Sequence, residues 1–595
     1  MEGNITRSIS KNDANLKEDN KEVDFDELLS SAGEFGSYQV FLFCLTFPFY
    51  IYGVFSYFSQ LFMTEVSPNH WCWVPELENL TEYQRRGLAI PNDGNARFGY
   101  SQCKVYKANW SEVLSTGQRP NDTWPVETCK FGWEFNKTEI PYPTISSELG
   151  WVCDKNSYRA TAQAIFFFGS IVGGFIVGWV ADRFGRLPAA ALSNMIGCVA
   201  GIASIFSQTL VHFSLCRFIM GMSYDNCMMM TYLLCLEYVA PKYRTIISNL
   251  PFAIFYTIGV TTIPWIALAC GHWKILSLAT SIPMALAILA PFLIPESPRW
   301  LLSKGRIDET VDKIITIGRI NKKIIPSKLI EQFKQSTLKK GAEENISIIN
   351  VFKRQKIRKC FICMCLVFMC CMAVFDALVR SVGSLGYDFF ISFTLVSLTE
   401  FPSLIIVSFI SDITGRKWTA IVALLLCSIF SILTAFIDSG LPSVMCAVLA
   451  RFMVNISSNV TMQWAAEILP TPVRGSGASI VHICGYVATI ISPYIVYLEN
   501  FINWLPLVIV GVIAFLGSVL ALVLPETAGV DLPQTFEDSD SLIDKQKFFD
   551  IPIMRKKEPE IYEGLKYYKR FEELKLYYIK NNAFSLTKIK DTLII

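Results

Sequence analysis

Long uninterrupted apolar blocks are the sequence feature that most restricts the fold of this chain. Ile165 to Trp179 contains no charged residue, and neither does Met284 to Ile294 or Ile421 to Phe436. Extended to about 20 residues, such blocks match the roughly 30 Å hydrocarbon core of a bilayer at about 1.5 Å per helical residue. Hydrophobic residues make up 52% of the 595 residues and charged residues 17%, which excludes a string of soluble domains. The sequence therefore predicts an all-α polytopic membrane protein.

Twelve apolar blocks fall into two groups of six, separated by a polar stretch in the middle of the chain. Their approximate limits are 39–62, 158–181, 187–207, 210–236, 248–270, 273–294, 359–380, 387–411, 418–437, 441–463, 475–497 and 504–524. The first block is too long, and begins too far from Met1, to be the core of a cleaved signal peptide. We therefore expect it to remain in the protein as the first spanning helix.

These blocks predict five regions of the chain. They are a cytosolic N-terminal segment (1–38), a first six-helix half (39–294) that includes an extracellular loop (65–156), a central cytosolic loop (295–358), a second six-helix half (359–524) and a cytosolic tail (525–595). The tail contains clustered basic and tyrosine residues at Lys566, Lys569 and Arg570 and at Tyr577 and Tyr578. It is a candidate binding segment for cytosolic partners or for the lipid of the inner leaflet.

The polar loop between the first two blocks carries four cysteines and four glycosylation sequons. The cysteines are Cys72, Cys103, Cys129 and Cys153, and the sequons begin at Asn79, Asn109, Asn121 and Asn136. An even number of cysteines in one loop indicates two disulfides in an oxidising compartment, with three pairings open. Sequons alone are weak signals, because Asn4, Asn345, Asn455 and Asn459 also match the pattern. Together with the cysteines they indicate that this loop lies outside the cytoplasm.

Basic residues in the short connections favour a topology with both termini in the cytosol. The connections predicted to face inward carry Arg183 and Arg186, Lys242 and Arg244, Arg416 and Lys417, and Arg474. This bias follows the rule that cytoplasmic loops are enriched in lysine and arginine. Acidic residues before the first block do not fit this bias, but acidic residues weigh little in that rule.

An internal repeat relates the two groups of blocks. Residues of the same type recur after the second and eighth blocks, after the fourth and tenth, and after the sixth and twelfth, always at the same offset (412 − 182 = 230). The repeated pairs are Asp182 and Asp412, Gly185 and Gly415, Glu237 and Glu467, Arg244 and Arg474, and Glu296 and Glu526. Because one offset fits three separate sites, the sequence predicts two six-helix halves that run in the same direction.

This arrangement resembles the major facilitator superfamily, whose two halves are parallel repeats. Three features are similar to its organic cation, organic anion and carnitine transporter family: the sequon-rich first loop, the string from Pro295 to Leu301, and the opening from Asp24 to Gln39. The resemblance covers residues 24 to 530. It implies a plasma-membrane transporter of solute carrier type, which moves small organic ions by alternating access and needs no cofactor.

Charged residues at the predicted cytosolic helix ends are candidates for a gate. Acidic and basic side chains there can form charge-assisted hydrogen bonds that hold the inner side shut and break when it opens. We expect this role for Asp182, Arg183, Gly185, Arg186, Glu237, Arg244, Glu296, Arg299, Asp412, Arg416, Glu467 and Arg474. The alternative is a role in topology and folding alone. Leu187 stands where the family usually has a basic residue, which predicts a weaker first-half latch than the second-half latch, where Lys417 is kept.

Charged residues inside apolar blocks are costly in hydrocarbon, so each is expected to face a partner or a cavity. Glu400 is the first substrate candidate, because cation-transporting members of the resembled family carry a glutamate in this Glu-x-Pro context and no basic residue lies near it in sequence. Asp225 is a second negative candidate. Asp376 and Arg380 can neutralise one another at a spacing of four. Arg217 and His482 are more typical of structural positions.

Aromatic residues on the same helices complete the predicted site. In the resembled family, cation carriers usually have an aspartate, and anion and carnitine carriers an arginine, where this chain has Tyr486. We expect Phe375, Tyr486 and Trp464 to line the cavity, where a ring face attracts an ammonium group. The sequence therefore favours amines, quaternary ammonium compounds or zwitterions as substrates, with carnitine-like or anionic substrates as the alternative.

Other classes of function fit the sequence less well. A net charge of +2 argues against a nucleic-acid partner. We find no P-loop and no His-Glu-x-x-His motif, so we do not expect an enzyme. Cys360, Cys363 and Cys365 are spaced like metal ligands but lie at the start of a helix in reducing surroundings, so no metal is expected. A non-transporting sensor that keeps the fold, and a channel, remain as alternatives.

Overall fold

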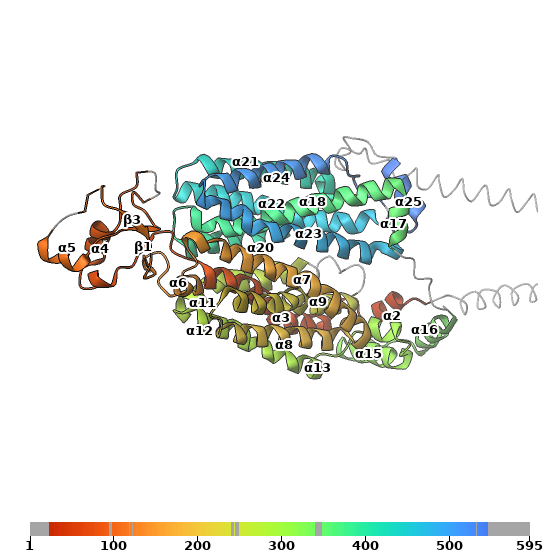
Figure 1. The fold of residues 1–595 in the computed structure, drawn as a ribbon. Helices are drawn as coiled ribbons and strands as arrows, with labels where there is room; N and C mark the ends of the chain where they lie inside the picture. Colours follow the sequence, from red (N-terminus) through yellow and green to blue (C-terminus); the bar gives the residue numbers. More distant parts are fainter. Residues whose placement is uncertain are drawn as a thin grey trace, which may run out of the picture.

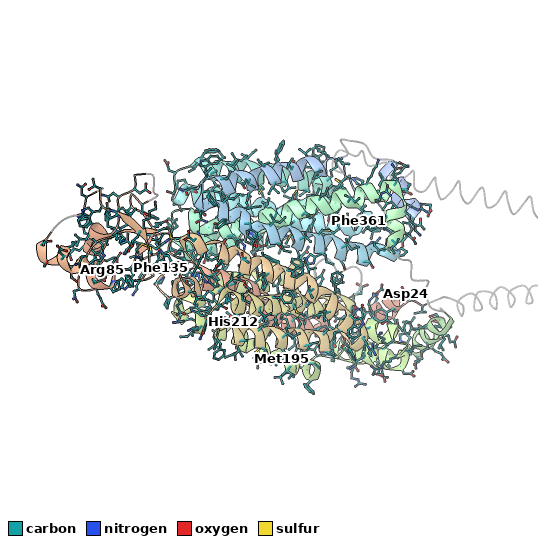
Figure 2. All side chains as sticks on the ribbon, viewed as in Figure 1. Asp24, Arg85, Phe135, Met195, His212 and Phe361 are labelled. Carbon is teal, nitrogen blue, oxygen red and sulfur yellow. A yellow bond between two sulfur atoms is a disulfide. The ribbon has the colours of Figure 1, made fainter. Side chains whose placement is uncertain are left out.

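A computed structural model describes residues 23–94, 98–117, 120–121, 123–239, 243, 249–339, 348–530 and 532–544. Its long helices form two bundles side by side, and a small unit projects from one end of them (Figure 1). We call this end the loop end, and the opposite end, which carries the repeated charged residues, the motif end. Arg85 and Phe135 lie in the projecting unit, whereas Asp24 lies at the motif end (Figure 2). Residues 1–22 of the predicted N-terminal segment (1–38) and residues 545–595 of the predicted tail (525–595) lie outside the described residues.

The first half contains six membrane-length helical segments within its described residues. They are α3 (Ser37–Thr64), α7 (Ser157–Phe184), α8 (Arg186–Ser204), α9 (Leu210–Glu237), α11 (Thr257–Cys270) preceded by the π-helical turn η4 (Phe252–Tyr256), and α12 (Trp273–Ser281) continued by η5 (Ile282–Leu289) and α13 (Ala290–Leu293). Pro283 explains the change of helix type after α12, because proline lacks the N–H group that a continuous α-helix requires.

The second half repeats this arrangement. Its segments are α18 (Gln355–Arg380), α19 (Phe389–Leu398) followed by α20 (Glu400–Thr414), α21 (Arg416–Phe436), α22 (Leu441–Ile468), α23 (Arg474–Tyr497) and α24 (Leu505–Ala521). Among the described residues, 10 helices are long and apolar enough to cross a membrane. The other two segments are α24, which is apolar but has 17 residues, and α9, which has 28 residues and contains Arg217 and Asp225. The predicted all-α fold with two six-helix halves is confirmed.

Short helices cover the motif end of each half. The first half has α2 (Phe25–Ser31), α14 (Pro298–Ser303), α15 (Ile307–Ile320) and α16 (Ser327–Lys339), and the second half has α17 (Ile349–Lys353) and α25 (Phe536–Asp544). The Asn321 side chain, just after α15, accepts a hydrogen bond from the Tyr38 backbone N–H (3.0 Å) and donates to the Ala32 carbonyl (3.2 Å). On the other half, Arg354 contacts Asp540 at 3.1 Å and Lys356 contacts Asp544 at 2.6 Å. Polar contacts of this kind attach the short helices to the long ones.

The projecting unit, here called the loop unit, is built from residues 65–156. It contains two antiparallel strand pairs, β1 (His70–Cys72) with β4 (Trp133–Phe135) and β2 (Lys104–Tyr106) with β3 (Val126–Thr128). Its helical elements are η1 (Pro75–Leu77), α4 (Glu82–Ala89), α5 (Trp110–Thr116), α6 (Ile145–Leu149) and η2 (Cys153–Lys155). Trp71, Leu77 and Trp110 are buried in a small core of its own.

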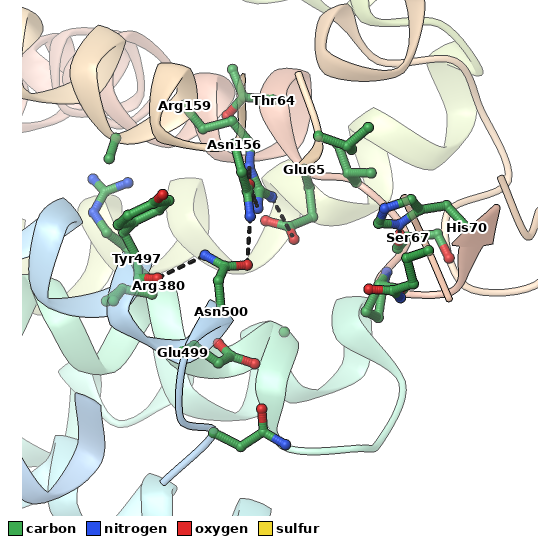
Figure 3. A pocket seen from close by; sticks show the side chains of 18 of the residues that line it. Thr64, Glu65, Ser67, His70, Asn156, Arg159, Arg380, Tyr497, Glu499 and Asn500 are labelled. Carbon is green, nitrogen blue, oxygen red and sulfur yellow. Dashed lines mark hydrogen bonds and ion pairs between the residues drawn. The ribbon is translucent and has the colours of Figure 1, made fainter. Parts of the chain in front are cut away.

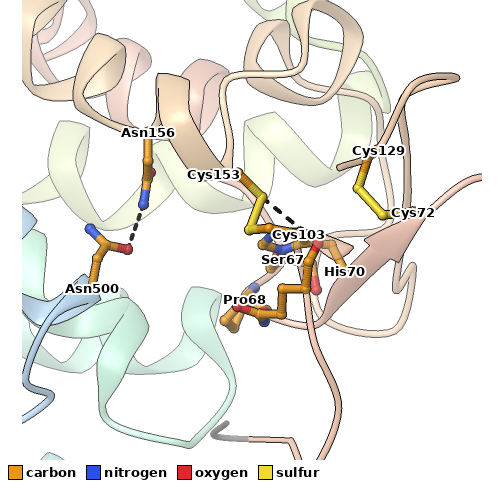
Figure 4. Close-up of a disulfide and its surroundings, with 10 residues drawn as sticks. Ser67, Pro68, His70, Cys72, Cys103, Cys129, Cys153, Asn156 and Asn500 are labelled. Atoms are coloured by element: carbon orange, nitrogen blue, oxygen red, sulfur yellow. Dashed lines mark hydrogen bonds between the residues drawn. A yellow bond between two sulfur atoms is a disulfide. The ribbon is translucent and has the colours of Figure 1, made fainter. Parts of the chain in front are cut away.

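Two disulfides hold the loop unit together, and the structure selects one of the three pairings that the sequence left open. Cys72 bonds to Cys129, and Cys103 bonds to Cys153 (Figure 4). The second bond joins the middle of the loop unit to η2, immediately before α7. The loop unit is therefore fastened to the first half at a second point besides the end of α3.

Burial of His70 predicts acid sensitivity of the loop unit. Desolvation lowers the pKa of this imidazole from 6.5 to about 4, although the Ser67 carbonyl near Nδ1 (3.2 Å) opposes part of that shift. The unfolded state therefore binds more protons below pH 6.5, so the free energy of unfolding should fall as the pH drops from 6.5 towards 4. At pH 5 we expect a loss of about 2 kcal/mol relative to pH 7.

Hydrogen exchange of the β1–β4 backbone, corrected for its intrinsic pH dependence, would measure this loss. His70→Phe keeps a ring beside Phe135, whose centroid lies 5.7 Å from that of His70, and removes the titrating group. The variant should show little of the pH dependence. An equal loss in the variant would assign the effect to another residue.

Candidate functional site

The motif end of the first half is organised around the carboxylate of Glu296. This carboxylate accepts hydrogen bonds from the backbone N–H groups of Arg186 (3.0 Å) and Leu187 (3.1 Å), the first two residues of α8. A negative group at a helix N-terminus is stabilised by the unpaired N–H groups and by the helix dipole. Gly185 makes the approach possible, because it has φ +113° and a Cβ at this position would collide with the Glu296 carboxylate.

The second half contains the same capping interaction, made by the equivalent residues at the start of α21. The carboxylate of Glu526 accepts hydrogen bonds from the backbone N–H groups of Arg416 (2.9 Å) and Lys417 (3.1 Å) at the start of α21. Gly415 has φ +90°, and a Cβ there would collide with Glu526. The residues that repeat in the sequence therefore fulfil the same local task in both halves.

The arginine that follows each glycine connects two acidic residues of its own half. Arg186 donates to Asp182 at 2.8 Å and lies 3.5 Å from Glu237. In the same way, Arg416 donates to Asp412 at 2.7 Å and contacts Glu467 at 3.1 Å. Asp182 and Asp412 stay largely in contact with solvent, since their side chains are 80% and 69% exposed.

In the part of the chain that the structure describes, the predicted gate residues form their ion pairs within one half, so pairing across the halves when the motif end closes stays a prediction. Each of the ion pairs just described joins residues of one half. Arg474 donates to the carbonyls of Leu469 and Pro533 within the second half instead of pairing with Glu467. Arg299 pairs with Asp26, and the Arg183 guanidinium lies over the rings of Trp179 and Phe184. Arg244 lies outside the described residues.

Glu400 is not an unpaired carboxylate, because α22 supplies a cation that its sequence neighbours do not. The Arg451 guanidinium donates to Glu400 at 2.7 Å, and both side chains are almost fully buried. Arg451 also donates to the Phe375 carbonyl and lies 3.4 Å from the centre of the Phe375 ring. Arg451 therefore supplies, from a distant part of the chain, the cation that the sequence around Glu400 lacks, and it covers the Phe375 ring. Whether Glu400 contacts a substrate stays a prediction.

Asp376 and Arg380 form the neutralising pair that their spacing predicts, and the pair reaches across to the first half. Arg380 donates to Asp376 at 2.7 Å and 3.1 Å within α18. The Tyr57 hydroxyl of α3 donates to the same Asp376 carboxylate. This network is one of the polar connections between the halves.

Asp225 lies at the interface of the halves beside His482 and a group of aromatic rings. Its carboxylate on α9 is 3.6 Å from His482 Nδ1 on α23. The His482 ring lies 4.9 Å from the Tyr486 ring, and Tyr486 lies 6.3 Å from Tyr224. Tyr224 in turn lies 5.2 Å from Tyr57, so a row of tyrosines connects Asp225 with the Asp376–Arg380 pair.

The remaining predicted residues are accounted for within single halves. Trp464 is fully buried in the core of the second half and donates its indole N–H to the Pro525 carbonyl at 2.6 Å. It therefore has no surface towards the space between the halves, contrary to the expectation that it lines a cavity. Arg217 donates to Gln60 Oε1 (2.6 Å) and to the Ser56 carbonyl (2.8 Å), which fits the predicted structural position.

Asp225 stands apart among the charged groups in the middle of the bundles. Asp376 and Glu400 each have an arginine partner, whereas the described residues offer Asp225 a histidine and no arginine or lysine. A neutral histidine leaves the Asp225 carboxylate charge uncompensated. Its side chain is 15% exposed and that of His482 is 27%, so this pair is more open than Glu400 and Arg451. The arrangement can therefore bind a cation or a proton at Asp225.

Sequence reasoning missed Arg451, Tyr57 and Tyr224. Arg451 carried a usable signal, because a cation inside the apolar block 441–463 requires an acidic partner and Glu400 was the unpaired acid. The tyrosines carried no such signal, since the chain has 23 of them and most would fit an ordinary helix interface.

The Glu400–Arg451 pair leads to a stability prediction. Glu400→Gln should destabilise the purified protein by about 3 kcal/mol, because it leaves Arg451 buried without a carboxylate. Replacing both members, as Glu400→Leu with Arg451→Met, should recover most of that loss, since a buried pair can often be exchanged for apolar residues. Thermal unfolding followed by tryptophan fluorescence would measure all three variants, with Arg451→Met alone as the fourth corner. Unchanged stability of Glu400→Gln together with lost cation binding would instead make Glu400 a ligand.

Comparisons with known proteins agree with this geometry. Residues 104–537 match the family described as "Sugar (and other) transporter". The chain is 29% identical over 564 residues to the carcinine transporter of Drosophila melanogaster, covering 91% of this chain and 83% of that protein. It is 26% identical over 533 residues to organic cation transporter 1 of Caenorhabditis elegans, covering 88% and 89%. It shares its fold with the xylose transporter XylE from E. coli in an inward open conformation, with a TM-score of 0.55, 16% identity and coverage of 84% and 99%.

Proposed function

Since the chain belongs to the sugar (and other) transporter family, we propose that it carries small organic amines, quaternary ammonium compounds or zwitterions across the plasma membrane by alternating access. Two of the relatives compared above are named as transporters of carcinine and of organic cations, which supports this substrate class. Carriage of carnitine-like molecules or organic anions, and a sensor that binds without transport, are the alternatives.

The single observation that carries this proposal is the setting of Asp225. It is a partly exposed carboxylate at the interface of the halves, with a histidine as its described ionic partner and with tyrosine rings beside it. A carboxylate supplies charge for an ammonium group, and a nearby ring face adds roughly 0.5 to 2 kcal/mol of attraction. A site built from α9 and α23 would also be remodelled whenever one half rocks against the other.

The contacts between the halves support a conformation that is closed on the loop side of Asp225. Phe58 and Phe62 of α3 pack against Phe393 of α19, with ring centroids 5.6 Å and 4.9 Å apart. Tyr57 joins Asp376, and Asn156 before α7 joins Asn500 in η8 (Leu498–Asn500). Towards the motif end, the ribbons of the two halves diverge (Figure 1). In this conformation the substrate would enter or leave from the motif end.

The exposed carboxylates of the repeated motif are suited to form a latch in the conformation that is closed at the motif end. When the motif end closes, Asp182 and Asp412 can exchange water for polar groups of the other half, while Arg186 and Arg416 hold them in position. Lys417 remains buried in the second half, whereas Leu187 takes its place in the first.

The loop unit provides support for the proposed orientation. Asn79, Asn109 and Asn121 are exposed, and Asn136 is half-buried, so the sequons are accessible to a glycosylating enzyme. Together with the two disulfides, this accessibility supports our proposal that the loop end faces the outside of the cell and that the motif end, with both termini, faces the cytosol.

Removing the Asp225 charge tests the proposed substrate site. Asp225→Asn should reduce the uptake of labelled tetraethylammonium into reconstituted vesicles by one to two orders of magnitude, because a charge-assisted contact contributes about 1.5 to 3 kcal/mol. Asp438→Asn, the same change at an exposed residue after α21, should leave uptake unchanged. An inside-negative potential should increase cation uptake. Uptake of an anion in preference to the cation would favour the alternative substrate class, and saturable binding without accumulation would favour a sensor.

Removing the Asp182 charge tests the latch. Asp182→Asn should leave the amount of protein at the cell surface unchanged and reduce uptake several-fold, because an exposed ion pair adds little to stability. Surface biotinylation and initial uptake rates measure the two effects. Asp412→Asn is the matched variant in the second half, and its effect should be larger, because Lys417 strengthens that latch. Normal transport in both variants would contradict the latch.

A further inference from the structure

A cavity lies at the loop end, outside the layer of contacts that closes the halves. Its volume is about 560 Å³, within the range of small-molecule sites. Residues of three parts of the molecule line it: the end of α3 with the adjoining segment of the loop unit, the start of α7, and the loop-end tips of α18 and α23 (Figure 3). The cavity is therefore shared by both halves and the loop unit.

The wall that the loop unit contributes is held in place covalently. Gln102 and Cys103 line the cavity, and the disulfide from Cys103 to Cys153 ties this segment to the start of α7 (Figure 4). On the opposite wall, Asn500 accepts a hydrogen bond from Asn156. These connections give the cavity a defined shape in this conformation.

Acidic side chains outnumber basic ones around the cavity. The charged lining residues are Glu65, Asp93, Glu499, Arg159 and Arg380. Both arginines already hold acceptors, since Arg159 donates to Asn156 Oδ1 at 2.7 Å and Arg380 donates to Asp376 at 2.7 Å. By formal charge the lining therefore carries one more negative than positive group, which favours organic cations over anions.

Glu65 and Gln163 are the lining groups with capacity for a ligand. The Glu65 carboxylate forms an ion pair with Arg159 without a direct hydrogen bond (3.6 Å to Nη1), and its side chain is 20% exposed, so an ammonium group would share this carboxylate with the arginine. Gln163 follows Arg159 by one helical turn of α7, so the two side chains share a face. Gln163 is 2% exposed, and its Nε2 has no hydrogen-bond partner. An unmade hydrogen bond at a buried donor costs about 1 to 3 kcal/mol, which an acceptor atom of a ligand would recover once the Gln163 side chain turns its amide towards the cavity.

The floor of this cavity separates it from Asp225. Arg380 lines the cavity and also donates to Asp376, which in turn accepts from Tyr57 of the other half. A ligand in the cavity would therefore lie on the outer side of the Tyr57–Asp376–Arg380 network, while Asp225 lies beyond the tyrosine row on its inner side.

We propose that the loop-end cavity is a second binding site, for small organic ammonium ions that also carry a hydrogen-bond acceptor. The ammonium group binds at Glu65, and the acceptor binds the Nε2 donor of Gln163. This site goes beyond the proposed function, because its occupancy does not depend on transport or on Asp225.

The test uses the full-length protein carrying Asp225→Asn, so that the interior carboxylate is absent. Isothermal titration would compare choline, which has both groups, with tetramethylammonium, which lacks the acceptor, and 3,3-dimethylbutan-1-ol, which lacks the charge. We expect choline to bind one site, and each of the other two probes to bind about tenfold more weakly, as for the loss of one charged or polar contact. Absence of choline binding, or equal binding of all three probes, would overturn the proposal without bearing on uptake through Asp225.

Two variants in the same background assign the contacts. Glu65→Gln should weaken choline about tenfold, whereas Glu65→Asp should retain most of the affinity. Gln163→Met should weaken choline and leave tetramethylammonium unchanged. Glu112→Gln, on the surface of α5 and outside the cavity, is the matched control, and size-exclusion elution checks folding. Choline affinity that is unaffected by Glu65→Gln would contradict the proposal, and so would an equal effect of Gln163→Met on both cations.

Discussion

The hydrocarbon core of the bilayer is the constraint on which the rest of this structure depends. Backbone groups there have no water to bond, so the spanning chain is helical throughout. Charged side chains face the same requirement, and the structure meets it with pairs such as Glu400–Arg451 and Asp376–Arg380. Against that background, Asp225 is an exception among the described residues, because its carboxylate lies beside a histidine and not beside an arginine, and our proposal of a ligand site there rests on this difference.

The duplicated motif solves a separate problem at the membrane surface. Where the chain turns from α7 into α8 and from α20 into α21, the first N–H groups of a new helix need acceptors. Glu296 and Glu526 supply them from the end of each half, and Gly185 and Gly415 leave room for their carboxylates. Each half is thereby tied to itself, which suits halves that move as units against each other.

The spacing of residues along the chain predicted much of the candidate site, and the parts that it did not predict share one cause. The offset of 230 residues predicted equivalent acids and bases, and the structure uses them equivalently. Arg451 was missed as the partner of Glu400 because it lies 51 residues away along the chain, although it is 2.7 Å away in space. Trp464 was expected to line the cavity because it lies on a helix that was expected to do so, but the sequence does not show in which direction its side chain points. Distance along the sequence does not report helix rotation or packing partners.

The sequence alone determined that this chain spans a membrane in two parallel six-helix halves with a cysteine-bearing loop between the first two helices. These features depend on local hydrophobicity and on a repeated order of residues, and both can be read directly along the chain. The tertiary structure alone decided which cysteines pair, which charges neutralise each other, and that a cavity with an unpaired Gln163 donor opens beside Glu65. Those outcomes depend on side chains from distant segments meeting within a few ångströms, and residue spacing cannot encode that geometry.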